Sequence, residues 1–147
     1  MLRNRWFGLV ASTAIFVTGF LLGSAFRPAA DVHAQGGSRV FELRTYTTPE
    51  GKLGDLEARF RNHTIGIFNQ HGMASVGYWV PEDPPLKQNT LIYVLAHTSR
   101  EAAAKSWEDF RADPEWQKVA AESERNGKLV TKVESVFMDP TDFSAIK

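Results

Sequence analysis

The chain has 147 residues, of which 43% are hydrophobic and 23% charged, and its formal net charge is zero. This composition is typical of a globular protein with room for one domain of ordinary size. Because the charge is balanced and no polybasic run is present, binding to nucleic acid or to a lipid surface is not expected. Cysteine is absent, which excludes disulfides, thiol nucleophiles and thiolate metal sites.

The N-terminal segment has the features of a targeting sequence. Arg3 and Arg5 precede an uncharged stretch over residues 6–26, and Ala34 ends a site that suits signal peptidase. The stretch is also long enough to span a bilayer. Residues 1–34 are therefore expected to be a cleaved signal peptide or a membrane anchor. Both alternatives predict an exported protein, periplasmic or secreted. The protein is expected to contact the membrane only if the N-terminal segment is not cleaved.

A Gly-rich linker over residues 35–38 leads into a single domain, which we place at residues 39–143. Alternating strand formers, helical periodicity and capping residues predict its elements. In chain order these are a strand over 40–47, a helix that starts at Thr48-Pro49-Glu50 and stops at Gly72, a strand over 73–80, a proline-rich loop over 81–89, a strand over 90–97, a helix from Ser99 to Ala112, a short helix after Asp113 and a strand over 129–138.

This order predicts an α+β fold of the ferredoxin-like βαββαβ type, with helices on one face of a four-stranded antiparallel sheet. In the first strand the apolar set is expected to face the helices: Phe41, Leu43 and Thr45. The polar set is then expected on the open face: Glu42, Arg44 and Tyr46. Lys132 and Glu134 of the last strand are also expected on the open face, as partners for the charges of Glu42 and Arg44. For the third strand the pattern leaves two alternatives, in which either residues 92, 94 and 96 or residues 93, 95 and 97 face the open side. A face that mixes charge with aromatic rings is expected to pair with a second copy.

Several motifs keep their order through the domain: Phe41-Glu42-Leu43-Arg44-Thr45-Tyr46, His63, His71-Gly72-Met73, Gly77-Tyr78-Trp79, Phe110-Arg111-Ala112-Asp113-Pro114-Glu115-Trp116 and Val133-Glu134-Ser135. On these motifs the domain resembles the NIPSNAP family. The resemblance implies a ferredoxin-like chain that pairs into a dimeric α/β barrel, here from two copies. The family has no settled reaction, and its wider structural relatives include small monooxygenases and haem-binding barrels, which is an analogy of fold alone.

Six residues are candidates for a ligand site: Glu42, Arg44, Tyr46, His63, Trp79 and Trp107. Glu42 and Arg44 form either a cross-strand ion pair or, enclosed by a dimer, a site for an anionic group. Both tryptophans are either core residues or an apolar wall for a flat ligand. His63 is either an edge-of-core residue or a catalytic base.

No metal site or cofactor is predicted. Histidines 63 and 71 lie about 12 Å apart along a helix, too far to chelate one ion, and neither an HxH nor an HExxH motif occurs. The leading hypothesis is a homodimeric barrel that binds a small apolar or aromatic ligand, oriented by Arg44, Glu42 and Tyr46. The alternatives are a cofactor-independent monooxygenase with His63 as base, and a pure protein-interaction module.

Overall fold

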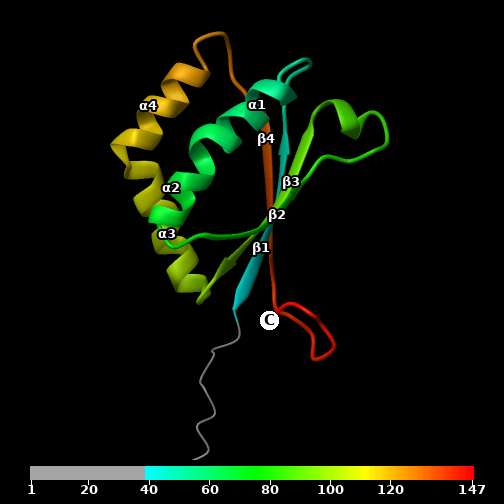
Figure 1. Ribbon diagram of the computed structural model, residues 1–147, viewed down its shortest axis with the longest axis vertical. Helices are drawn as coiled ribbons and strands as arrows, with labels where there is room; N and C mark the ends of the chain where they lie inside the picture. The colour runs from blue at the N-terminus through cyan, green and yellow to red at the C-terminus, as the bar shows by residue number, and fades with distance from the viewer. Residues whose placement is uncertain (1–38) are drawn as a thin grey trace, which may run out of the picture. The chain divides into compact units, whose positions relative to one another are not determined.

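The computed structural model describes residues 39–147 (Figure 1). The predicted targeting segment over residues 1–34 and the linker over residues 35–38 lie outside this range. Among the described residues, no helix combines the length and the apolar character needed to cross a membrane.

Four strands form one antiparallel sheet in the order β2-β3-β1-β4. Their bounds are β1 Val40–Thr47, β2 Ala74–Trp79, β3 Thr90–His97 and β4 Lys132–Met138. The α-helices lie on one side of this sheet, which leaves the other face without a cover of α-helices (Figure 1). The predicted ferredoxin-like α+β fold is therefore confirmed.

A long helical run follows β1 and consists of α1 Leu53–Arg59, the π-helix η1 Phe60–Thr64 and α2 Ile65–Gln70. The predicted start at Thr48-Pro49-Glu50 is wrong. Gly51 adopts φ +73°, a left-handed conformation that a helix cannot contain, and the Lys52 N–H closes a turn onto the Pro49 carbonyl at 3.2 Å. The predicted stop is confirmed, since Gly72 has φ +71° just after the run.

The second half of the chain contributes α3 Arg100–Ala112 and α4 Pro114–Ser123, besides a short 3₁₀ turn, η2 Leu86–Gln88, in the loop after β2. Both predicted caps are present. The Ser99 hydroxyl accepts from the Ala102 N–H at 3.1 Å, and the Asp113 carboxylate accepts from the N–H groups of Glu115 and Trp116. The second Asp113 oxygen lies 2.7 Å from His71 Nε2, which joins the end of α2 to the start of α4.

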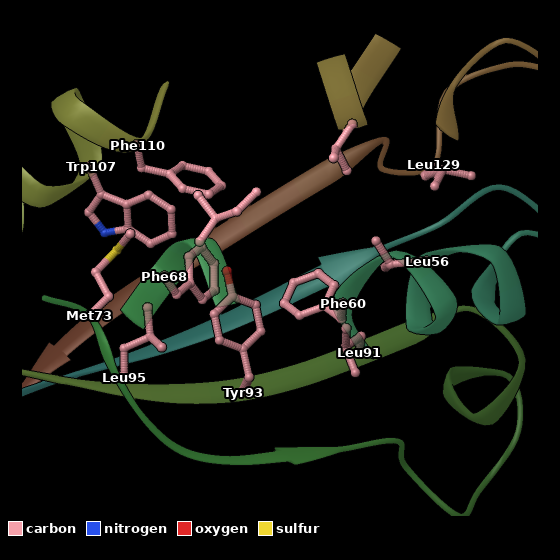
Figure 2. Packing of buried hydrophobic residues seen from close by; sticks show 12 residues of the cluster. Leu56, Phe60, Phe68, Met73, Leu91, Tyr93, Leu95, Trp107, Phe110 and Leu129 are labelled. Atoms are coloured by element: carbon pink, nitrogen blue, oxygen red, sulfur yellow. The ribbon is translucent and has the colours of Figure 1, made fainter. Parts of the chain in front are cut away.

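Aromatic rings fill the space between the helices and the sheet (Figure 2). Phe68 on α2 is at the centre, with ring centroids 5.0 Å from Phe110, 5.4 Å from Trp107 and 6.0 Å from both Phe60 and Tyr93. Most of these pairs are edge-to-face or tilted, the arrangements that aromatic quadrupoles prefer. These rings thus join η1, α2 and α3 to β3, one of the two central strands.

The two faces of β1 are reversed relative to the prediction. Glu42, Arg44 and Tyr46 face the helices, since Glu42 and Arg44 contact Trp107 of α3 and the Tyr46 ring packs against Phe60 at 6.0 Å. The set on the open face is instead Phe41, Leu43 and Thr45.

The open face is largely apolar, and β3 contributes Ile92, Val94 and Ala96 to it, the first of the two predicted phases. Lys132 and Glu134 lie on this face as predicted, but they stand opposite Thr47 and Thr45, and form an ion pair with each other at 2.9 Å. Their expected pairing with Glu42 and Arg44 is therefore wrong.

Candidate functional site

A buried carboxylate lies where the helix layer meets the sheet. The Glu42 side chain is only 1% exposed. One of its oxygens, Oε1, accepts from Arg44 Nη1 and from Ser135 Oγ, both at 2.7 Å. The other, Oε2, accepts from Trp107 Nε1 at 2.7 Å and lies 3.1 Å from His97 Nε2. Glu42 therefore ties β1 to β3, β4 and α3.

These contacts determine the charge of Glu42. Burial by itself raises the pKa of a carboxyl group, because it disfavours the charged form. Here the hydrogen bonds from His97, Ser135, Trp107 and Arg44 outweigh burial and lower the pKa of Glu42 from 4.5 to about 2. The side chain is thus an anion at neutral pH, matched by the Arg44 cation.

Arg44 links this network to a group of rings. Its guanidinium carbon lies 4.0 Å from the Trp107 ring centroid and 5.5 Å from that of Tyr46, distances at which a cation is attracted to the ring face. Its Nη2 also reaches the Tyr46 hydroxyl at 3.5 Å. The neighbouring Tyr93 is fully buried, and this burial raises the pKa of its phenol well above the ordinary value.

Beside this network, a cavity of about 210 Å³ lies between the sheet and the helices. Tyr46, Phe60, Phe68, Phe110 and Trp116 provide aromatic walls. The remaining lining comes from small, aliphatic and charged side chains: Arg59, Thr64, Ala120, Glu124, Val130 and Val133. An apolar cavity with a few polar groups is the usual form of a small-molecule site.

The π-helix η1 shapes one wall of this cavity. A π turn adds a residue to the helical repeat and is frequent at functional sites. Arg59, Phe60 and Thr64, which stand at or within this turn, are all buried and all line the cavity. The Thr64 hydroxyl donates to the Arg59 carbonyl at 3.3 Å, so this hydroxyl has its partner within the same helical run.

Arg59 separates the cavity from a groove on the outer surface. The groove, of about 380 Å³, lies between α1, η1 and α4 and shares Arg59 with the cavity. Arg59 Nη1 contacts Glu124 at 3.2 Å and the Ser123 hydroxyl at 3.4 Å, and its guanidinium lies 5.1 Å from the Trp116 ring centroid. A charged side chain is therefore held at the rim of an aromatic pocket.

The structure brings together four of the six predicted site residues, Glu42, Arg44, Tyr46 and Trp107, but on the helix-covered side of one chain. The expectation that Glu42, Arg44 and Tyr46 lie on the open face is wrong. His63 is exposed and lines the outer groove, not the cavity. Trp79 is 52% exposed and shares the open face with Ile92. Within residues 39–147, no cluster of three or more acidic or histidine side chains could hold a metal ion.

The sequence alone did not point to Arg59, Phe68 or Ala120 as site residues. Arg59 lies three residues after the buried Leu56, so ordinary helical spacing brings it to the interior. A signal for Phe68 was present, because the spacing from Phe60 through Thr64 is four residues and repeats once more.

This geometry defines the class of protein: a ferredoxin-like α+β domain with a pocket between its sheet and its helix layer. The chain belongs to the NIPSNAP family, whose pattern matches residues 41–145. A NIPSNAP family protein of unknown function from Agrobacterium tumefaciens is 25% identical, with a TM-score of 0.65 over 75% of this chain and 95% of that chain. An uncharacterised NIPSNAP domain protein from Burkholderia xenovorans is 25% identical, with a TM-score of 0.60 over 71% of this chain and 97% of that chain.

A more distant likeness extends the fold beyond the family. A monooxygenase from Streptomyces coelicolor, solved in complex with nanaomycin D, is 15% identical, with a TM-score of 0.50 over 75% of this chain and 94% of that chain. At this identity the likeness concerns the fold alone. The comparison with curated protein sequences gives no match.

Proposed function

We propose that this domain binds a small apolar or aromatic molecule in the cavity between sheet and helices, as an exported homodimer. The observation that supports the binding function is the cavity itself, about 210 Å³ with five aromatic side chains in its wall. Tyr46 supplies a hydroxyl at the wall, and Arg44, 3.5 Å from that hydroxyl, holds it in place.

The volume limits the size of the ligand. An engineered apolar cavity of ~150 Å³ remains dry and binds benzene, whereas pockets for drug-sized ligands measure roughly 300–1,000 Å³. At about 210 Å³ the cavity lies between these values. A ligand with one ring or two fused rings is therefore the expected size class.

Filling the cavity by mutation tests this proposal. Ala120 of α4 lines the cavity and is half-buried, so Ala120→Leu places three further carbon atoms in the ligand's space. We expect about tenfold weaker binding of naphthalene, or more, since each such overlap costs about 1–3 kcal/mol. Calorimetric titration of the purified full chain measures the affinity.

The matched control is Ala121→Leu, which makes the same change at an exposed neighbour on α4. It should bind naphthalene as the unchanged protein does. If Ala120→Leu binds naphthalene as tightly as Ala121→Leu, or if the unchanged protein binds none, the cavity is not the site and the proposal fails.

The alternative function is that of a cofactor-independent monooxygenase. It is supported by the similarity in fold to the Streptomyces coelicolor monooxygenase. Such chemistry needs a base near the substrate, and His63, the base predicted from the sequence, is exposed outside the cavity. For this chain, binding therefore has the more direct support from the geometry.

The homodimer is proposed because of the open sheet face. Val136 is 55% exposed and Trp79 is 52% exposed on this face, beside Leu43, Ile92 and Val94. Apolar patches of this kind on a monomer commonly mark interfaces, and a single face that pairs with itself gives a closed two-fold dimer.

We expect the protein to be a dimer at micromolar concentration, with the molar mass measured by light scattering. Because the full chain includes the uncharged stretch over residues 6–26, the mass is corrected for bound detergent. Val136→Glu places a charge in the proposed interface and should give monomers, because an unpaired buried charge is costly. Ala121→Glu, on the exposed surface of α4, is the control and should remain dimeric. A monomeric unchanged protein would contradict the proposal.

A further inference from the structure

We propose that the natural ligand is an aromatic carboxylate, whose ring occupies the cavity and whose carboxylate binds Arg59 at the rim. This inference rests on the proposed binding function and adds the charge of the ligand to it. It concerns a residue that the sequence did not indicate, at the boundary between the cavity and the outer groove.

The first step is the burial of Arg59. Its side chain is only 4% exposed, and a charge removed from water in this way needs compensation from partners. Both side-chain hydrogen bonds of the guanidinium use the same nitrogen, Nη1. The buried Nε has no hydrogen-bond partner among the described residues, so the guanidinium is only partly satisfied by its present contacts.

The second step is the weakness of the present partner. Glu124 meets Arg59 through a single contact at 3.2 Å, and the Glu124 side chain is 34% exposed. Guanidinium groups bind carboxylates most strongly through two parallel hydrogen bonds. Glu124 caps the C-terminal end of α4, where it can turn towards solvent and leave Arg59 to a ligand.

The contrast with Arg44 supports the choice of Arg59. Arg44 contacts a fully buried carboxylate, Glu42, at 2.7 Å, and the two charges neutralise each other. Arg59 instead lines the cavity, with the Trp116 ring beside its guanidinium. A ring in the cavity would therefore bring a carboxylate attached to it close to Arg59.

The test compares two ligands of nearly equal shape, 2-naphthoate and the neutral 2-naphthamide, by calorimetric titration of the full chain. The unchanged protein should bind 2-naphthoate about 10- to 100-fold more tightly, the range for a hydrogen bond to a charged partner. Glu124→Gln removes the competing carboxylate, so it should tighten the binding of 2-naphthoate by a larger factor than that of 2-naphthamide.

The control is Glu108→Gln, which removes one negative charge at an exposed position on α3 and should change neither affinity. If 2-naphthamide binds as tightly as 2-naphthoate, or if Glu124→Gln does not favour 2-naphthoate, the role of Arg59 is overturned while the binding function stands. If neither compound binds, the proposed function itself fails.

Discussion

Replacement of Glu42 by Gln is expected to lower the free energy of unfolding by about 3–5 kcal/mol, the usual cost of breaking a buried ion pair. The carboxylate accepts from four side chains, Arg44, Trp107, Ser135 and His97. Glutamine offers an oxygen at one position and an NH₂ group, itself a donor, at the other. Two of the four donors therefore lose their acceptor, and Arg44 loses its counter-charge.

Urea unfolding measures this effect, and repeating it in acid checks its origin. The pKa of Glu42 is about 2 in the folded protein, against 4.5 as the reference. A lowered pKa adds stability that is present in full above pH 4.5 and is lost as the pH falls towards 2. The corresponding free energy is about 3 kcal/mol. The difference in stability between the unchanged protein and Glu42→Gln should therefore shrink between pH 4.5 and 2.

The control is Glu134→Gln on the open face. Glu134 also forms an ion pair, with Lys132 at 2.9 Å, but both side chains are exposed. An exposed pair contributes at most about 1 kcal/mol, so this variant should unfold near the unchanged protein. If Glu42→Gln loses no more stability than Glu134→Gln, the buried network does not hold the sheet to α3 as the geometry indicates.

The order of the elements could be predicted because its signals are local. Ser99 and Asp113 cap their helices through neighbours two or three residues away, and Gly72 ends α2 by its own backbone conformation. A sequence pattern records such short-range requirements directly. The start of the first helix was predicted wrongly, because Pro49 and Glu50 favour a helix that Gly51 prevents.

The face of β1 could not be predicted for a physical reason. The assignment assumed that the more apolar set lies under the helices, but here both faces of the sheet are apolar, and the charged pair is buried. What holds Glu42 inside is three partners at sequence distances of 55, 65 and 93 residues: His97, Trp107 and Ser135. No short pattern contains such long-range compensation, so the three site residues of β1 were identified but placed on the wrong face.

Replacement of Phe68 by Ala is the second substitution with a large expected effect. It should lower the free energy of unfolding by about 3–5 kcal/mol, as for other buried aromatic side chains. Phe68 is buried among Phe60, Tyr93, Trp107 and Phe110. It also lines the ligand cavity, so its removal enlarges the space available to a ligand. Phe143→Ala, at an exposed position, is the control and should change stability by less than about 0.5 kcal/mol.

The same variant separates a binding cavity from a merely imperfect core. An apolar ligand that fills the enlarged space restores contacts that the mutation removed, and a ligand that binds only the folded state raises its stability. Saturating naphthalene should therefore raise the melting temperature of Phe68→Ala by more than that of the unchanged protein, and that of Ala120→Leu by less. An equal shift in all three proteins would mean that naphthalene binds elsewhere, because the two substitutions change the volume of this cavity in opposite directions.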